Sequence, residues 1–558
     1  MTTSCLDWER RIVHGESLIP PPLFPNEAED ALAIFKSLRV VDAPGCPTMG
    51  EACKPWIFDV VRSVFGAYDG RVGSNTEGRR LISEWLVSVS KKNFKSGLAA
   101  GIMMTALIRN WRQSAEYGIL APTIEVANNS FFPARDMILK DEELADLFQV
   151  QGHVRTITHR TSGATLKVIA AENETVGGKK FTGVLFDELW LFGKRLNAAD
   201  MMREATGGLT SRPEGFVISL TTMSNEAPCG VFREKLLYGR GVRDGRIKDK
   251  KFVPVLYEFP KHMIDDKSYR DPKNWYVTNP NMGASVDAER LDDLHKQAVE
   301  AGEEALIGFF AKHINYEIGL AMQSDRWMGA DYWESCAAPR FDLEELIRRS
   351  DVIDVGIDGG GLDDLLGLAV LGRDAKTGKW LLWVRAWAHP SVLERRKSEA
   401  SRFADFARDG DLVMVARIGD DVKEVAEIVA RCESSGKLDK VGLDPIGLGG
   451  IMDSLLEYDV PQEKIIGITQ GWKMSGAILT AERRVAEGNL EHSGSDLMNY
   501  SIGNVRIEPR GNAQIATKQA AGRAKIDPFL AFLNAVSLMS LVPESGASIY
   551  DTQGVYIG

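Results

Sequence analysis

The hydrophobic pattern divides the chain into two parts. From residue 54 to about 225, short apolar runs alternate with longer segments of helical periodicity. Apolar runs without polar alternation are typical of parallel strands whose two faces are both covered. After about residue 346, three strands joined by short turns come first, and helices and strands alternate afterwards. The first pattern predicts a three-layer α/β domain, and the second predicts another α/β domain that begins with an antiparallel meander.

A chain of 558 residues is too long for one hydrophobic core, so we expect several domains. The predicted segments are an N-terminal lead at 1–50, an α/β domain at 51–320 with a lid subdomain at about 226–320, a linker at 321–345 and a second domain at 346–558. A helix is expected at Asn26 to Arg39 and another at Ser391 to Arg408.

Composition excludes several classes of protein. No apolar run reaches the length that spans a membrane, and residues 1–10 lack the apolar region of a secretory signal. Six scattered cysteines favour reduced, cytoplasmic thiols over a disulfide framework or a zinc site. The formal net charge of −11 argues against a general nucleic-acid coat, but a local basic surface could still contact DNA.

Two adjacent acids end an apolar run at residues 181–190, FTGVLFDELW. A buried strand that leads into Asp187 and Glu188 has the Walker B arrangement, in which the first acid orders a Mg²⁺ shell and the second orients or deprotonates the attacking water. The alternative is a core strand followed by a polar loop.

A candidate phosphate-binding loop lies upstream, in residues 86–97, LVSVSKKNFKSG. An apolar run, a polar loop, Lys95-Ser96 and a helix follow one another, so that backbone N–H groups could hold phosphates while Lys95 reaches their oxygens and Ser96 binds Mg²⁺. Val89 and Phe94 stand where the standard pattern has glycine. A basic turn is the alternative interpretation.

Three acids stand at the ends of predicted elements in the second half: Asp358, Asp444 and Asp527. Clustered carboxylates are what a two-metal nuclease needs, because hard cations prefer oxygen ligands. A strand meander followed by alternating helices and strands is the order of a ribonuclease-H-like fold. Each acid also has a structural alternative: Asp358 could start a glycine turn, Asp444 a loop, and Asp527 could cap the last helix. Asp363 and Asp364 are weaker candidates.

The first half resembles the large terminase subunits of tailed phages, in their HK97-like branch. The loop Ser90 to Ser96 resembles that family's deviant phosphate loop, with Phe94 in place of glycine. Lys54-Pro55-Trp56 resembles its adenine-side motif, residues 124–129 resemble the strand after the first helix, Gly177-Gly178 precedes the acid strand, and Thr221-Thr222 resembles the coupling motif.

The second half resembles the nuclease of the same family. The matching stretches are Gly356-Ile357-Asp358 with Asp364, Leu443-Asp444-Pro445, and residues 525–528, Lys-Ile-Asp-Pro, followed by Asn534. Gln470-Gly471-Trp472, His492, Asn504 and Lys518 fall between them in the family's order, and His492 and Lys518 could face DNA phosphate or serve the structure.

The resemblance implies a P-loop ATPase followed by a ribonuclease-H-like nuclease, which together package viral DNA and cut its concatemers. It implies nucleotide-binding residues at Lys91, Lys92, Asn93, Lys95, Ser96, Asp187 and Thr222, a catalytic Glu188, and catalytic metal ligands at Asp358, Asp444 and Asp527. The implied cofactors are ATP, Mg²⁺ at Ser96 and Asp187, and two Mg²⁺ or Mn²⁺ ions at the nuclease. The implied partners are double-stranded DNA, the portal protein of the procapsid, the small terminase subunit and further copies in a ring, expected to be a pentamer, in the host cytoplasm.

Three other functions remain open at this stage. A nuclease-associated translocase or helicase would need further helicase motifs. An actin-like nucleotide-binding domain in the second half would need a second phosphate loop, for which residues 447–450 are a candidate. A structural portal or scaffold component would make both acid sets accidental.

Overall fold

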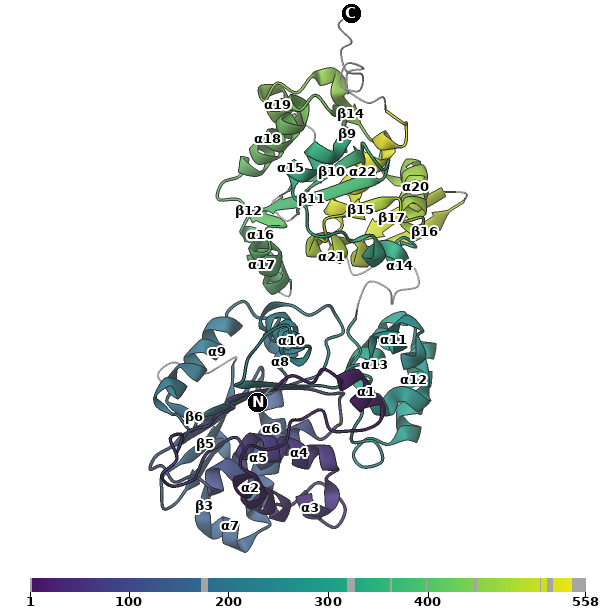
Figure 1. Cartoon of the computed structure of the whole chain (residues 1–558). Helices are drawn as coiled ribbons and strands as arrows, with labels where there is room; N and C mark the ends of the chain where they lie inside the picture. Colours follow the sequence, from purple (N-terminus) through teal and green to yellow (C-terminus); the bar gives the residue numbers. More distant parts are fainter. Residues whose placement is uncertain are drawn as a thin grey trace, which may run out of the picture. The chain divides into compact units, whose positions relative to one another are not determined.

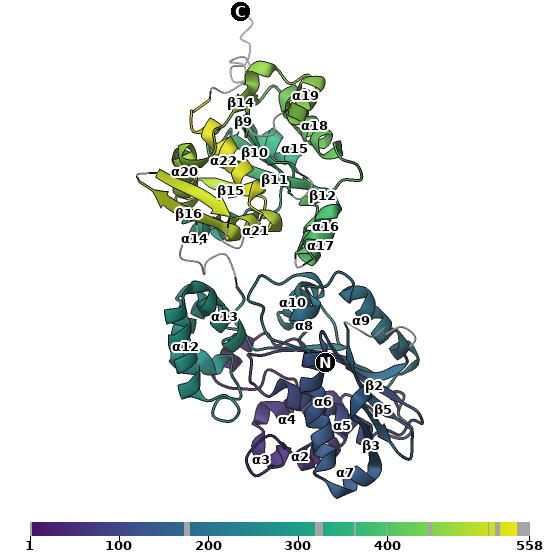
Figure 2. The same cartoon turned by 180° about the vertical axis from the view of Figure 1, so that it is seen from behind.

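The computed structural model describes residues 3–171, 179–318, 327–361, 364–397, 399–444, 449–511, 513–518 and 525–543. The chain forms two compact units, Met1–Ile318 and Gly319–Gly558. Figures 1 and 2 show both units from opposite sides. Within the described residues, none of the helices has the length and apolar character needed to cross a bilayer.

The first unit is built on an eight-stranded sheet of order β3-β4-β5-β2-β6-β7-β1-β8. Its strands are β1 (Glu84–Ser88), β2 (Glu116–Ala121), β3 (Phe148–Gln151), β4 (Thr156–His159), β5 (Thr165–Ala170), β6 (Phe181–Phe186), β7 (Phe216–Thr221) and β8 (Phe252–Leu256). Along the sheet, the neighbouring strands β5, β2, β6, β7, β1 and β8 pair in parallel. At the other end, β3 pairs antiparallel with β4, and β4 pairs antiparallel with β5. The six residues of β6 and of β7 are all buried, which explains their unbroken apolar character.

Helices cover both faces of this sheet. The helices of the first unit are α1 (Trp8–Val13), α2 (Pro25–Ser37), α3 (Met49–Ala52), α4 (Pro55–Phe65), α5 (Lys95–Ile108), α6 (Ile124–Leu139), α7 (Glu142–Leu147), α8 (Leu189–Phe192), α9 (Ala198–Gly207), α10 (Gly230–Arg243), α11 (Lys261–Asp265), α12 (Ala288–Ala301) and α13 (Glu303–His313). Both views show α2, α4, α5 and α6 on one side of the sheet and α8, α9 and α10 on the other (Figures 1 and 2). The predicted three-layer arrangement is therefore confirmed.

One local prediction in this unit was wrong. Residues 124–129, expected to form a strand, begin helix α6, and the strand is β2 just before them. Thr123 caps the helix by accepting a hydrogen bond from the backbone N–H of Val126 at 3.3 Å, and Glu125 lies in the first turn. A threonine cap with an acid behind it is a strong helix start, and it outweighs the β-branched residues of the segment. Gly177-Gly178, expected before the acid strand, lies outside the described residues.

The second unit has a sheet of order β12-β11-β10-β9-β13-β14, and β15 pairs with β11. The strands are β9 (Ser350–Gly359), β10 (Leu366–Asp374), β11 (Trp380–Ala388), β12 (Leu412–Met414), β13 (Leu438–Leu443), β14 (Ile465–Gly467) and β15 (Leu490–His492). The strands β9, β10 and β11 form an antiparallel meander. Strand β13 pairs in parallel with β9, and β14 pairs in parallel with β13, which completes the predicted ribonuclease-H-like sheet. A separate hairpin joins β16 (Val505–Arg510) to β17 (Ala513–Lys518).

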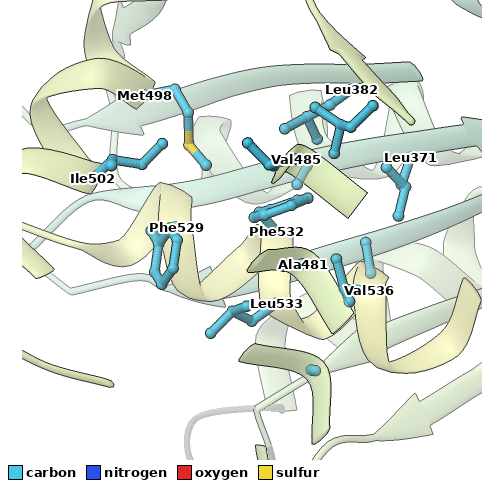
Figure 3. Packing of buried hydrophobic residues seen from close by; sticks show 14 of the residues in the cluster. Leu371, Leu382, Ala481, Val485, Met498, Ile502, Phe529, Phe532, Leu533 and Val536 are labelled. Atoms are coloured by element: carbon cyan, nitrogen blue, oxygen red, sulfur yellow. The ribbon is translucent and has the colours of Figure 1, made fainter. Parts of the chain in front are cut away.

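Helices lie on both faces of this sheet as well. They are α14 (Ala330–Trp333), α15 (Leu343–Arg349), α16 (Ser391–Arg395), α17 (Ala400–Arg408), α18 (Asp420–Ser434), α19 (Gly449–Glu457), α20 (Ser475–Ala486), α21 (Asp496–Asn504) and α22 (Asp527–Met539). The helix expected at 391–408 is thus two helices. On one face, Phe529, Phe532 and Val536 of α22 pack among side chains of α20, α21 and the central strands (Figure 3).

Part of the predicted linker lies in this core. Trp327 and Trp333 are fully buried in the same hydrophobic cluster as Phe529 and Phe532. The ring of His492 stacks on Trp333 with centroids 4.1 Å apart, and its Nε2 lies 2.8 Å from the Trp333 carbonyl oxygen. His492 is therefore a structural residue, and burial lowers the pKa of its imidazole.

Candidate functional site

The predicted phosphate loop and the acid strand meet at one edge of the first sheet. Strand β7 separates β1 from β6, and all three run parallel. Their carboxyl ends therefore lie side by side, where α/β sheets bind ligands. The phosphate loop follows β1, Asp187 follows β6, and Thr222 follows β7. This places the nucleotide-binding residues that the sequence predicted along one edge.

The loop before α5 is held by contacts of Asn93 with residues 279 and 281. Asn93 donates a 2.9 Å hydrogen bond to the Asn279 side chain, and its Oδ1 accepts one of 3.0 Å from the Asn281 N–H. Lys92 and Phe94 both have positive φ, at 70° and 62°. Since few side chains other than glycine adopt this conformation readily, the loop holds backbone strain at the position where the standard pattern has glycine.

Lys95 and Asp187 are both buried at this edge. Lys95 is 6% exposed, and its Nζ lies 3.4 Å from the Ser90 carbonyl oxygen. Ser130 donates a 2.5 Å hydrogen bond to Asp187 Oδ2, while Asp187 Oδ1 is buried and has no hydrogen-bond partner among the described residues. Burial and the adjacent Glu188 raise the pKa of Asp187 to about 6. A carboxylate oxygen in this state fits a Mg²⁺ ligand.

Glu188 has a left-handed backbone conformation, with φ at 54°. The indole N–H of Trp190 donates a 2.6 Å hydrogen bond to Glu188 Oε2. Lys91 and Lys92 are exposed beside this edge, Ser96 is half-buried, and Thr222 is 2% exposed. The predicted nucleotide-binding side chains therefore differ in solvent exposure. Asn93 is fully buried, and its side chain makes the hydrogen bonds that hold the loop.

The three predicted nuclease acids line one cavity of about 410 Å³ in the second unit. Asp358 is near the end of β9, Asp444 follows the adjacent parallel strand β13, and Asp527 begins α22. Asp364 lies on the same cavity. Asp363 and residues 445–448, which include the first two residues of the candidate second phosphate loop at 447–450, are outside the described residues. In the described part of the chain, no three acids, histidines or cysteines are already close enough together to hold an ion.

Close packing of α22 on the sheet positions Asp527. A Cβ on Gly356 would lie 2.6 Å from the Ala535 backbone nitrogen, and one on Gly367 would lie 2.8 Å from the backbone carbon and oxygen of Asp527. These glycines let the helix approach the strands. The cap of α22 is Ile526, so the alternative interpretation of Asp527 as the cap was wrong. Asp527 is instead 2% exposed in the first turn.

Several polar side chains support the acids. Gln470 Nε2 donates to Asp358 Oδ1 at 3.3 Å and to Asn534 Oδ1 at 3.1 Å, and Asn534 Nδ2 donates to the Ile357 carbonyl oxygen at 2.8 Å. Lys525, 3% exposed, forms an ion pair with Asp364. Strand β17 lies next to the cavity through Ala516, but the Lys518 side chain is outside the described part.

Sequence analysis missed some residues of the first site. Ser130, which holds Asp187, and Lys312, whose Nζ lies 3.0 Å from the centroid of the Trp190 ring, belong to no motif. Burial lowers the pKa of Lys312 to about 7, and Glu188 opposes that fall. Both residues lie far along the chain from their partners, so no local pattern could have identified them.

Comparisons with known proteins identify the family of the chain. Residues 247–541, more than half of the chain, match the family described as terminase large subunit, endonuclease domain. The large terminase subunit of Enterobacteria phage HK97 is 23% identical over 506 residues, which cover 88% of this chain and 91% of that protein.

Solved structures of large terminases are also similar. The crystal structure of the HK97 large terminase has 18% identity and a TM-score of 0.47, with 92% of this chain and 99% of that chain covered. A large terminase from a thermophilic bacteriophage has 12% identity and a TM-score of 0.31, over 84% of this chain and 96% of that chain. The helicase and actin-like alternatives are not favoured. The chain belongs to the large terminase subunits, which combine an ATPase that packages viral DNA with an endonuclease.

Proposed function

We propose that the residues assembled above carry the two activities: ATP hydrolysis at the edge formed by β1, β7 and β6, and metal-dependent cleavage of double-stranded DNA in the cavity of the second unit. The observation that carries the proposal is the meeting of Asp358, Asp444 and Asp527 around one cavity, although each lies far from the next in the sequence.

At the ATPase edge, Lys95 would bind the β- and γ-phosphate oxygens, and the loop from Lys91 to Asn93 would offer backbone N–H groups to them. Ser96 and Asp187 would hold Mg²⁺, which neutralises phosphate charge when bound. Glu188 would orient the attacking water and accept its proton. Thr222 lies at the end of the strand between the two halves of the site, where it would report the state of the nucleotide to the rest of the unit.

At the nuclease, Asp358, Asp444 and Asp527 would hold two Mg²⁺ or Mn²⁺ ions. Such ions supply an activated water and a stabilised leaving oxygen. Gln470 orients Asp358 from the side, and Lys525 balances the charge of Asp364.

The partners follow from the family. We propose that the chain acts on concatemeric viral DNA in the host cytoplasm, with the small terminase subunit, and docks on the portal of the procapsid as a ring of copies, a pentamer. We also propose the predicted division into a lead at 1–50, an ATPase domain at 51–320 and a nuclease domain at 346–558, with the buried part of the intervening segment counted with the nuclease.

The test measures phosphate release and plasmid cleavage by the full chain, wild type and two variants. Glu188→Gln should lose ATP turnover by about 100-fold or more and keep cleavage, because an amide cannot accept the proton. Asp444→Asn should lose cleavage and keep ATP turnover. Exposed Asp453 in α19, changed to Asn, is the control. Normal turnover by Glu188→Gln or undiminished cutting by Asp444→Asn would reject the respective site.

A further inference from the structure

Lys312 connects three parts of the ATPase edge. It is the second-last residue of α13, in the predicted lid. Its Nζ donates a 3.0 Å hydrogen bond to the carbonyl oxygen of Met223, the residue after Thr222. Its own carbonyl oxygen accepts a 2.7 Å hydrogen bond from the N–H of Lys91 in the phosphate loop. The end of α13 is therefore bound to both sides of the nucleotide edge.

The same ammonium group lies against the residue that holds Glu188. Lys312 Nζ is 3.0 Å from the centroid of the Trp190 ring, whose N–H donates to Glu188 Oε2. The backbone N–H of Trp190 donates to Thr221 Oγ1 at 3.1 Å, so the indole is anchored at its base. A cation on an aromatic face is attracted to the ring and draws electron density from it, which makes the indole N–H a stronger donor.

The segment after α13 completes the connection. Asn315 Oδ1 accepts a 2.8 Å hydrogen bond from the N–H of Met223, while Lys312 binds the carbonyl oxygen of the same residue. Asn315 also donates to Ser88 Oγ at 3.2 Å and to the Tyr257 carbonyl oxygen at 2.8 Å. Met223 is thus held on both its backbone polar groups by one short stretch of chain.

We propose that Lys312 is a positioning residue for Glu188: it acts through Trp190 and Met223, and it couples the end of α13 to the water-activating carboxylate. The proposal rests on the assignment of Glu188 above. Lys312 fixes the indole plane, and the indole N–H fixes the Glu188 carboxylate that would orient the attacking water. A change in the position of α13 then changes the position of Glu188 through these contacts.

A neighbouring lysine provides a matched control. Lys194 also lies near the Trp190 ring, with its Nζ 5.5 Å from the centroid, but its side chain pairs with half-exposed Glu226 at 2.9 Å. An exposed ion pair of this kind contributes little. Lys194→Met removes a cation from the same indole without removing a link to Met223.

The experiment measures ATP turnover by the full chain at varied ATP concentration. Lys312→Met should lower kcat by about tenfold and leave KM within about twofold, because the loss of one positioning hydrogen bond and one cation–π contact acts on the chemical step. Lys312→Arg should restore most of kcat, since a guanidinium can stack on the indole and donate to the same carbonyl. Lys194→Met should match the wild type.

A double variant tests whether Lys312 acts on Glu188 through the indole N–H of Trp190. Trp190→Phe keeps a ring and removes the N–H, so adding Lys312→Met to it should cost no more than about twofold further. Additive losses, an equal rise in KM, or a normal kcat in Lys312→Met would overturn the proposal. Glu188→Gln in the same assay separates the two claims: normal turnover there rejects the assignment of Glu188, whereas a dead Glu188→Gln beside a normal Lys312→Met rejects only the role of Lys312.

Discussion

The ring of Phe94 lies directly over Gly97 in the first turn of α5. A Cβ built on Gly97 would lie 2.6 Å from Phe94 Cε2, which is closer than real Cβ contacts come. Phe94 also has φ at 62°, where a side chain costs of order 1–3 kcal/mol. The glycine missing from position 94 is therefore compensated by a glycine three residues later, which makes room for the phenyl ring.

Changing Phe94 to Gly should raise ATP turnover by the isolated subunit several-fold. Glycine adopts positive φ without strain and lets the backbone approach the phosphates. The measurement is steady-state phosphate release without procapsids. Unchanged or lower turnover would mean that the loop does not limit the isolated subunit and that the strain is tolerated at no cost to activity.

Changing Gly97 to Ala should lower turnover and ATP affinity in the wild-type background, because the new Cβ meets the Phe94 ring at the start of α5. The same change should be nearly silent in the Phe94→Gly background, where the ring is gone. Nucleotide binding and turnover of the four proteins form a double-mutant cycle. Equal losses in both backgrounds would show that the two residues do not interact.

Changing Gly367 to Ala should reduce DNA cleavage by about tenfold or more and leave ATP turnover unchanged. Gly367 pairs with Asp358 across β9 and β10, and a Cβ there would push against the backbone of Asp527. Separating these acids weakens metal binding. Gly476→Ala in α20, where a Cβ meets nothing within 4 Å, is the control. Full cleavage by Gly367→Ala would show that the close approach of α22 is not needed.

Cleavage should require a divalent cation. Mn²⁺ should support cleavage at least as well as Mg²⁺, because Mn²⁺ tolerates looser coordination geometry. Ca²⁺ should bind to the site without supporting cleavage. Chelation should abolish cutting. Mn²⁺ should also raise the thermal midpoint of the wild type more than that of Asp358→Asn, since a ligand that binds only the folded state stabilises it. Cutting that persists in excess chelator would contradict a metal-dependent site.

Changing Asp354 to Asn should stabilise the protein at pH 8 by about 1–3 kcal/mol and much less at pH 4. Asp354 is buried in β9, where it accepts a hydrogen bond from the Lys440 N–H, and its Oδ2 has no partner among the described residues. Burial, together with nearby Asp439, raises the pKa of its carboxyl from 3.8 to about 7.

The sign follows from proton binding. Between about pH 4 and pH 7 the folded protein holds the proton of Asp354 and the unfolded chain does not, so stability falls as pH rises through this window. Asparagine removes that dependence. Urea unfolding of the full chain at pH 4, 6 and 8 measures it, with exposed Asp453→Asn as the control. If the difference in free energy of unfolding between the wild type and Asp354→Asn stayed the same from pH 4 to pH 8, the predicted titration of Asp354 would be contradicted.

The sequence by itself determined the elements and the chemistry of this protein. An unbroken run of mostly apolar residues identified the buried strand β6, because a strand covered on both faces needs no polar alternation. Acids placed directly after such strands identified Asp187, Glu188 and Asp358 as candidates. Local patterns failed at some element boundaries: Thr123 caps a helix where a strand was expected, and the single helix expected at 391–408 is two helices.

Only the tertiary structure decided which distant residues lie together. The order of the strands brings Asp444 beside Asp358, and α22 brings Asp527 onto the same cavity, because glycines far away in the sequence allow that helix to lie close to the sheet. The placement of Lys312 on Trp190 likewise depends on packing between segments more than 100 residues apart. Such contacts are set by the burial of whole elements against one another, which no local pattern of residues records.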